Sequence, residues 1–144
     1  MTQDAFGPED AKRLLQEVFA PWVAEIGLEP LVFSDRQARF RLPENPRLAL
    51  RGGPGQGVLC GQAVAAVADT AVVLALSGAN GRFRVCTTVD LSVSFIRPLS
   101  GPAEVTVDIE SNGRKMAVAR VSLRAEGAEK AAALATATFM YLED

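Results

Sequence analysis

Apolar and polar side chains follow two rhythms along the chain, and each rhythm predicts a different kind of element. Across residues 8–26 the apolar side chains recur every three to four positions, as on one face of an amphipathic helix. These side chains are Leu14, Leu15, Val18, Phe19, Trp22 and Val23. Pro8 suits the first turn of a helix, Pro21 predicts a kink or an end, and Gly27 stops the segment.

Six other segments predict strands, and the last four of them alternate apolar and polar residues. They cover residues 28–34, 37–42, 85–96, 103–110, 115–125 and 130–142. Asn112-Gly113 is a strong two-residue hairpin signal, and a further turn is expected at residues 126–129. This period of two indicates an antiparallel sheet with one covered face.

Alternation also assigns the residues of segment 85–96 to two faces. The apolar face is expected to carry Val85, Val89, Leu91, Val93 and Phe95. The polar face is expected to carry Thr88, Asp90, Ser92 and Ser94. On this pattern Thr88 and Asp90 point the same way.

Residues 57–79 predict a central helix, which follows a long loop rich in proline and glycine at residues 43–57. The helix is dense in alanine and valine, and a helix that is apolar all round is buried all round. Asp69 is the only charged residue between Gly52 and Gly81. Because a charged side chain is almost never fully buried without a partner or a use, Asp69 is the first candidate for chemistry.

These elements predict one α+β domain over residues 1–144, in which a long central helix is wrapped by a curved antiparallel sheet of five to six strands. One sheet leaves part of such a helix uncovered, so a homodimer is expected. The helix is also long and apolar enough to be considered as a membrane span. Asp69 near its middle would cost about 2.5–3.5 kcal/mol on insertion scales, which favours the buried helix of a soluble protein.

Composition narrows the function classes. Hydrophobic residues make up 49% of the 144 residues and charged residues 22%, and the net charge of −2 gives no basic footprint for nucleic acid. The chain has no histidine, which excludes Ser-His-Asp and Cys-His catalysis and any His-ligated metal. Cys60 and Cys86 are too few for a disulfide framework, and residues 1–8 lack the pattern of a signal peptide. We therefore expect a cytoplasmic protein with no metal.

The order of elements resembles the hotdog-fold thioesterases. The motifs that carry the resemblance are GQGVLCGQAVAAVADTA on the central helix and TTVDLSVSFIRP on the next strand. The resemblance covers nearly the whole chain after Gly27 and is strongest to the group related to the phenylacetic-acid-pathway thioesterase. It implies an acyl-CoA thioesterase that hydrolyses an acyl- or aryl-CoA thioester to the free acid and CoA. It also implies a homodimer or a dimer of dimers, with coenzyme A present only as part of the substrate.

Four residues take catalytic positions under this resemblance. The family opens the helix with a His-Gly-Gly turn, where this chain has Cys60-Gly61-Gln62, and an acidic residue follows at the position of Asp69. The resemblance implies that Asp69 is general base or nucleophile and that backbone amides at Gly61 and Gln62 polarise the thioester carbonyl. It implies that Thr88 helps to hold the water, and we expect Asp69 of one subunit to face Thr88 of the other. The turn histidine is absent, and Asn45 lies too far upstream to match the asparagine of the family.

Coenzyme A carries phosphates, which require basic groups. The resemblance places the nucleotide near the loop after the third strand and near the following hairpin. We therefore expect the CoA site at Arg82, Arg97, Gly113, Arg114 and Lys115. Arg47 and Arg51 in the long loop are alternatives at an entrance, and the small side chains Ala65, Ala66 and Ala68 suggest room for a bulky or elongated acyl group.

Other interpretations stay open at this point. A non-catalytic acyl-CoA- or CoA-binding protein would keep the pocket without hydrolysis. A hydratase usually needs a His-Asp pair, which this chain lacks. A structural assembly protein would hold Asp69 in a closed and paired environment. Cys60 is a further candidate nucleophile, because a helix N-terminus favours the thiolate.

Overall fold

The computed structural model describes residues 5–143 of the chain. Residues 1–4 and 144 lie outside this range, so the expectation of no signal peptide, which rests on residues 1–8, falls partly outside the described residues. The first element is α1 (Pro8–Glu17), followed by α2 (Pro21–Ala24). The single helix predicted for residues 8–26 is thus two helices, because Pro21 begins a new one and holds Ala20 before it in an extended conformation.

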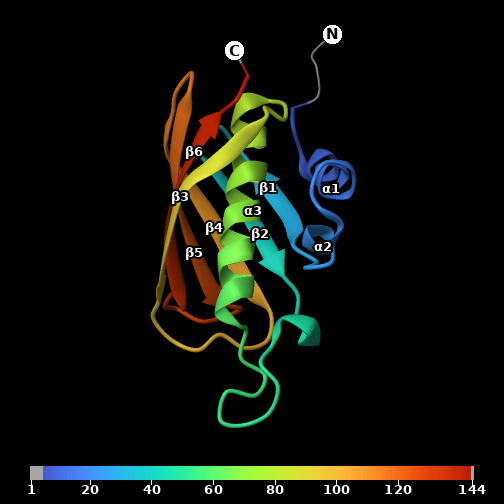
Figure 1. Cartoon of the computed structure of the whole chain (residues 1–144), viewed down its shortest axis with the longest axis vertical. Helices are drawn as coiled ribbons and strands as arrows, with labels where there is room; N and C mark the ends of the chain where they lie inside the picture. The colour runs from blue at the N-terminus through green and yellow to red at the C-terminus, as the bar shows by residue number, and fades with distance from the viewer. Residues whose placement is uncertain (1–4, 144) are drawn as a thin grey trace.

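Six strands form one antiparallel sheet in the order β1-β2-β4-β5-β6-β3. Their bounds are β1 (Glu29–Phe33), β2 (Gln37–Leu42), β3 (Cys86–Phe95), β4 (Ala103–Asn112), β5 (Met116–Ala125) and β6 (Ala133–Tyr141). The sheet curves around one side of the central helix, with α1 and α2 beside β1 (Figure 1). The predicted α+β architecture, a long helix against a curved antiparallel sheet, is confirmed, and β3 forms one edge of the sheet.

The central helix, α3 (Gly61–Asn80), begins later than the sequence predicted. Residues 57–60 were expected in the helix, but Gly57 has a positive φ of 85° and the next two residues form bridges, Val58 with Ser100 and Leu59 with Ala49. Cys60 is the extended residue before the helix. At the other end Gly81, with a φ of 75°, stops the helix in the left-handed conformation that glycine favours.

The core lies between α3 and the concave face of the sheet. Large side chains from the middle strands fill it, including Phe40, Leu42, Val105, Val107, Val121, Leu123 and Phe139. Alanines at positions 117, 119, 135 and 137 on β5 and β6 are also buried, and their small size lets the helix approach the sheet closely. Although α3 has the length and mean hydropathy of a membrane span, 61% of its most apolar window is buried in this core. That is the environment expected for the central helix of a soluble domain.

A β-bulge in β3 overturns the predicted assignment of faces. Thr88 pairs with Phe139 and Asp90 with Thr138, which leaves Val89 as an extra residue without a direct partner. Because one extra residue reverses the alternation, Thr88 points to the helix side of the sheet together with Leu91, while Asp90 stays on the outer side. The expectation that Thr88 and Asp90 share a face was therefore wrong.

The β4–β5 hairpin is present, but its connection is not the predicted two-residue turn. The loop consists of residues 113–115 and is closed by the Gly113 amide, which donates to the Met116 carbonyl. Asn112 remains in β4, where its side chain donates to Asn80 and accepts from the Tyr141 hydroxyl at 2.6 Å. Asn80 in turn donates to Tyr141, so three polar side chains join the ends of α3, β4 and β6. Burial raises the pKa of Tyr141. Its hydroxyl therefore stays protonated and can donate the hydrogen bond to Asn112.

The last turn of α3 can approach β1 because residue 78 is glycine. A Cβ atom built at Gly78 would lie 2.6 Å from Cδ1 of Phe33, far inside van der Waals contact. Phe33 is itself fixed by edge-to-face contacts with Phe6 and Phe40. The ring therefore has little freedom to move away, and the glycine is required by packing.

We predict that Gly78→Ala lowers the free energy of unfolding by about 1–3 kcal/mol, the usual cost of overpacking a core. Helix propensity alone would favour alanine by about 1 kcal/mol, so the sign of the effect reports the contact with Phe33. Urea unfolding followed by circular dichroism measures it. In a Phe33→Ala background the same change should cost much less, and an equal cost in both backgrounds would contradict the packing explanation.

Candidate active site

One stripe of α3 is not covered by the sheet. It carries Gln62, Ala66, Asp69 and Val73, whose spacing of four, three and four residues places them on one line along the helix. Gln62 is exposed and the other three are half-buried, whereas residues on the opposite side are fully buried. The composition predicted a helix that is buried on every side. The structure leaves one stripe uncovered, so this prediction was wrong. Asp69 lies in the uncovered stripe rather than inside the core.

Asp69 is held by Thr88 of the same chain. The Thr88 hydroxyl donates a hydrogen bond to Oδ1 of Asp69 at 2.7 Å. The sequence predicted that these two residues come together, but between two subunits; the contact in the structure is within one chain. The bulge at Val89 explains this geometry, because it turns Thr88 toward the helix.

The hydrogen bond leaves Asp69 able to act on a further group. Within residues 5–143 the only hydrogen bond to its carboxylate is the one from Thr88, which engages Oδ1 alone. Asp69 also has no ion pair with any described basic side chain. A closed, paired environment, which would have indicated a purely structural role, is thus not what surrounds this carboxylate.

Cys86 lies on the same side of β3 as Thr88, two residues earlier. Burial raises the pKa of the Cys86 thiol, the negative charge of Asp69 raises it further, and the nearby Arg84 lowers it. Cys86 is therefore a protonated neighbour of the carboxylate and not a thiolate nucleophile. Its titration reports the charge on Asp69.

The start of α3 offers backbone donors. No side chain caps it, since Cys60 makes no capping hydrogen bond, and the first helical amides belong to Gly61, Gln62 and Ala63. The first i→i+4 bond of the helix runs from the Val64 amide to the Cys60 carbonyl. A Cβ at Gly61 would lie 3.4 Å from the Phe95 ring, an ordinary van der Waals contact, so packing does not require glycine at this position. The apolar pattern placed the helix start at Gly57, whereas the resemblance placed the opening turn at Cys60-Gly61-Gln62, where the helix begins.

The helix start and Asp69 are well separated along one helix. Eight residues of α-helix rise about 12 Å, whereas a general base and an oxyanion donor each act over about 3 Å. Asp69 is therefore too far from the start of its own helix to act on a carbonyl that is bound there. A second helix start near Asp69 would satisfy both distances.

An apolar pocket of about 330 Å³ lies beside the helix start. Its lining comes from three elements: Trp22, Glu25 and Ile26 at α2, Arg47 and Leu48 in the short 3₁₀ turn η1 (Pro46–Leu48), and Cys60, Gln62, Ala63 and Ala66 at α3. Sequence reasoning singled out Cys60, Gln62, Ala66 and Arg47, but it gave Trp22 only a place on the apolar face of the predicted first helix. The only signal available was a large aromatic residue at the end of the first helix.

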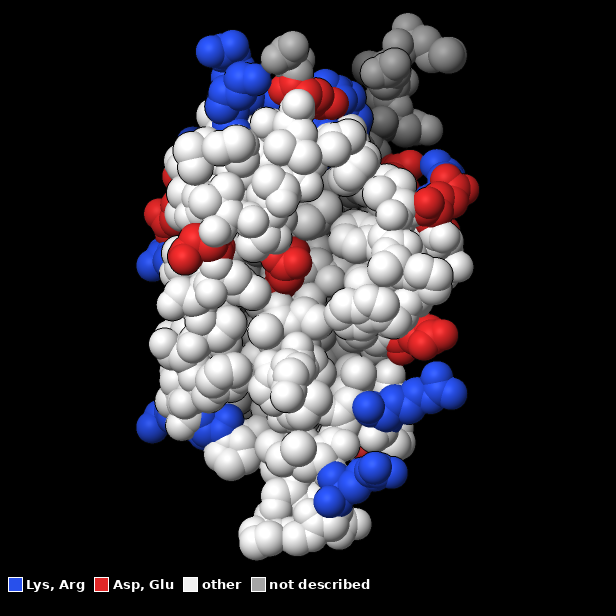
Figure 2. All heavy atoms as spheres, viewed as in Figure 1, with Lys and Arg blue, Asp and Glu red and all other residues white. Residues whose placement is uncertain are grey.

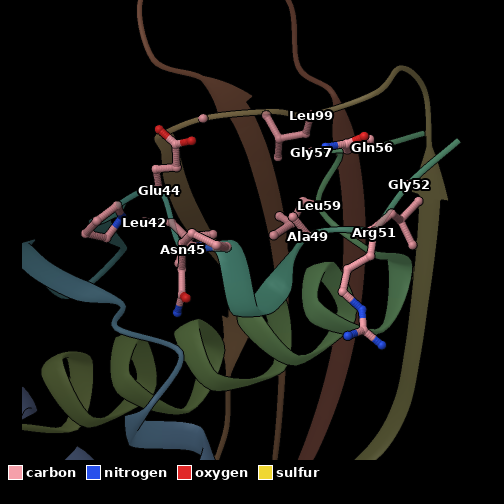
Figure 3. A pocket seen from close by; sticks show the side chains of 14 residues that line it. Leu42, Glu44, Asn45, Ala49, Arg51, Gly52, Gln56, Gly57, Leu59 and Leu99 are labelled. Atoms are coloured by element: carbon pink, nitrogen blue, oxygen red, sulfur yellow. The ribbon is translucent and has the colours of Figure 1, made fainter. Parts of the chain in front are cut away.

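Asn45 fixes two walls of this pocket relative to each other. Its side-chain amide donates to the carbonyls of Glu25 and Ile26, and its oxygen accepts from the Arg47 amide at 3.1 Å. These hydrogen bonds hold η1 against the end of α2. Figure 3, which shows a neighbouring cavity, has the Asn45 side chain pointing out of that cavity.

That neighbouring cavity, of about 290 Å³, lies under the long loop and is lined by Leu42, Glu44, Arg51, Gln56 and Leu99 among others (Figure 3). It contains none of Gly61, Gln62, Asp69 and Thr88. Arg51 therefore lines this cavity and not the pocket at the helix start.

The five expected CoA-binding residues fall into two groups. Arg82, Gly113, Arg114 and Lys115 lie near the C-terminal end of α3, whereas Arg97 follows the far end of β3 and donates to the Ala131 carbonyl. Most basic side chains on the face that carries α3 also lie toward its two ends (Figure 2). One chain does not bring all five residues to one place.

Several of these basic groups already have partners. Arg82 and Arg84 both bind Glu143, and together they hold its pKa below the ordinary value. Arg84 also donates to the Arg114 carbonyl and stacks 3.7 Å from the centre of the Tyr141 ring. Arg84 is therefore a structural residue, and Arg82 could bind a phosphate only in competition with Glu143.

Within residues 5–143 no group of three or more Cys, Asp or Glu side chains is arranged to hold a metal ion. The candidate groups are instead one carboxylate and one hydroxyl, together with the amides of a helix start about 12 Å away along α3. This set suits the activation of water and the stabilisation of a negative oxygen.

Comparison with known proteins places the chain in a family. Residues 50–140 match the family described as acyl-CoA thioesterase N-terminal domain, a range that includes Gly61, Asp69 and Thr88. A protein of Halobacterium salinarum that is named as a presumed esterase is 30% identical over 122 residues, which are 82% of this chain and 80% of that protein.

Solved structures show the same fold. A thioesterase from Haemophilus influenzae superposes with a TM-score of 0.81 at 22% identity, covering 97% of this chain and 93% of that chain. Zebrafish thioesterase superfamily member 2 superposes with a TM-score of 0.80 at 18% identity, covering 95% of this chain and 99% of that chain. At these identities the likeness concerns the architecture.

The contact between Asp69 and Cys86 makes a testable prediction. Asp69→Asn should lower the pKa of Cys86, because it removes a negative charge that raises this pKa. The pH dependence of iodoacetamide alkylation measures it, in a Cys60→Ser background that leaves Cys86 as the sole thiol. Asp90→Asn, on the outer face of β3, is the matched control and should leave the pKa of Cys86 unchanged. An unchanged value in Asp69→Asn would show that Asp69 carries no charge beside this thiol.

Proposed function

The chain belongs to the hotdog-fold thioesterase superfamily, and we propose that it hydrolyses an acyl- or aryl-CoA thioester to the free acid and CoA. The observation that carries the proposal is the Asp69–Thr88 hydrogen bond on the uncovered stripe of α3. It fixes one carboxylate oxygen and leaves the carboxylate accessible from the side that the sheet does not cover. An acid held in this way is suited to activating water.

In the proposed reaction Asp69 is the general base. Thr88 donates its proton to Oδ1 and can accept a hydrogen bond from water through its own oxygen, while Oδ2 accepts the proton of that water. The water oxygen attacks the thioester carbonyl carbon, and the carbonyl oxygen becomes negative. When the carbon–sulfur bond breaks, the sulfur leaves with the electron pair and takes up the proton, which gives CoA and a carboxylic acid.

The negative oxygen needs donors, and the uncapped start of α3 supplies them. The amides of Gly61 and Gln62 lie at the positive end of the helix dipole, and losing one such donor in an oxyanion hole typically costs about 10²–10³ in rate. Because this helix start lies about 12 Å along the axis from Asp69 of the same chain, we propose that two chains complete one site. One chain supplies the helix start and the other supplies Asp69 and Thr88.

The open edge of β3 is the proposed route to this dimer. Among the described strands β3 pairs only with β6, and exposed apolar side chains lie on it and directly beyond its ends, at Val85, Val89, Phe95 and Ile96. A long apolar edge strand is normally paired or covered. Antiparallel pairing of two β3 edges would bring the uncovered stripes of two α3 helices toward each other. A dimer of dimers is also compatible with this arrangement.

The same pairing would gather the basic groups. When two identical edges pair antiparallel, the end of one chain that holds Arg97 lies beside the end of its partner that holds Arg82 and Arg114. We propose that coenzyme A, which enters as part of the substrate, places its phosphates near this joint end. The two free cysteines fit a reducing, cytoplasmic setting.

A second candidate is a non-catalytic acyl-CoA-binding protein. The observation that favours it is Cys60 at the turn where the family resemblance places a histidine. Binding of an acyl-CoA by calorimetry without release of thiol, across short, medium and aryl substrates, would select this candidate over hydrolysis.

We predict that Asp69→Asn lowers kcat by about 10²–10⁴, the usual contribution of a general base, while the fold is retained. Thiol release from a panel of acyl-CoA substrates measures the rate, and circular dichroism with thermal unfolding checks the fold. Asp90→Asn should keep full activity, because Asp90 lies on the outer face of the sheet. Wild-type turnover in the Asp69→Asn variant would refute the assignment.

We predict that the wild-type chain sediments as a dimer or a larger even-numbered assembly at micromolar concentration. Val89→Lys should shift it toward the monomer and reduce hydrolysis in parallel, because a lysine blunts an exposed edge strand. Leu134→Lys is the control, since Leu134 is comparably exposed but lies on the outer face of β6. It should leave the β3-paired dimer intact. Full activity in a chain that remains monomeric would contradict the shared site.

A further inference from the structure

We propose that the pocket between Trp22 and the start of α3 holds the acyl group of the substrate, and that it selects an uncharged apolar group of limited size. This inference rests on the proposed hydrolysis and adds the substrate class. Three observations carry it: the position of the pocket, the chemistry of its lining and its volume. Each is independent of which chain contributes Asp69.

The pocket shares residues with the helix start. Gln62 and Ala63, which contribute two of the first helical amides, also line the pocket, and Cys60 lies at its edge. A thioester carbonyl at these amides therefore has the pocket directly beside it. The apolar hollow at Phe95, Ile96 and Val64 on the other side of the helix touches neither Gln62 nor Ala63. The acyl group is thus assigned to the Trp22 side.

The lining of the pocket is apolar and already ordered. Trp22, Ile26 and Leu48 form the wall, and Ala63 and Ala66 leave space along the helix. Trp22 is 59% exposed, so its ring is available to contact a ligand in the pocket. The hydrogen bonds of Asn45 hold α2 and η1 together, so the pocket walls are in place before a ligand binds.

The volume limits the acyl group. A closed apolar cavity of about 150 Å³ holds one benzene molecule, so about 330 Å³ corresponds to roughly six to twelve apolar carbon atoms. An octanoyl or a benzoyl group fits this range, whereas a palmitoyl chain exceeds it. Glu25 and Arg47 add one charge of each sign to the lining, so the pocket carries no net charge, and the rest of its surface is mainly apolar.

The test compares substrates by kcat/KM across acetyl-, octanoyl-, benzoyl- and palmitoyl-CoA. The expected order has octanoyl- and benzoyl-CoA above both acetyl- and palmitoyl-CoA. Ala66→Leu narrows the pocket and should lower the octanoyl-to-acetyl ratio of kcat/KM at least tenfold. Ala79→Leu makes the same change on the same helix outside the pocket and should leave the ratio unchanged. An unchanged ratio in Ala66→Leu, or a preference for palmitoyl-CoA, would overturn the proposal.

Two further measurements separate this proposal from the catalytic one. Trp22 is the only tryptophan of the chain, so its fluorescence in the Asp69→Asn variant reports the pocket alone. Octanoyl-CoA should shift the emission to shorter wavelength, and free CoA should not. A shift without hydrolysis by the wild type would leave the pocket standing and refute the catalysis. Hydrolysis of octanoyl-CoA with no change in Trp22 emission would refute the pocket. Trp22→Ala, at an exposed position, should move the preference toward longer acyl groups.

Discussion

The central constraint in this structure is that one curved sheet cannot enclose an apolar helix completely. The six-stranded sheet curves around one side of α3, and the stripe that it leaves uncovered exposes Asp69 among small and neutral residues. The cost of leaving such a stripe in water favours a second apolar surface over it. A carboxylate in that position avoids the full penalty of burial and still lies in the part of the surface that a partner or ligand would cover. The position of the acid thus follows from the geometry of the fold.

A single extra residue in β3 determines what the acid contacts. Without the bulge at Val89, regular alternation would turn the Thr88 hydroxyl to the outer face of the sheet, beside Asp90. With it, Thr88 reaches Asp69 at 2.7 Å, while Leu91 and Val93 continue to pack against the core. The bulge therefore separates the strand into one part that serves the core and one part that serves the carboxylate. It achieves this without changing the order of the strands.

Much of this fold could be predicted from periodicity, and the exceptions have physical reasons. All six strands were predicted, the last four from alternation, because burial of one face imposes that pattern, and the apolar segment predicted the central helix. The start of α3 was placed four residues early, because Val58 and Leu59 are apolar in either conformation and only their bridges exclude them from the helix. The bulge could not be predicted, since residues 88–94 alternate without interruption in sequence. Asp69 was identifiable as an isolated charge, but Trp22 and Asn45 acquire meaning only when α2 and η1 meet beside α3.

The separation between Asp69 and the helix start connects the proposed chemistry to the proposed dimer. If both groups acted from one chain, the fold would have to bridge about 12 Å of helix with the substrate alone. Two antiparallel copies remove that requirement, because they bring unlike ends together: a helix start can approach the acid of the other chain, and Arg97 can approach the other chain's Arg82 and Arg114. The open edge of β3, the uncovered stripe and the division of the basic residues between two ends are three separate features. A two-fold dimer accounts for all of them with one contact, whereas a monomer leaves each without a reason.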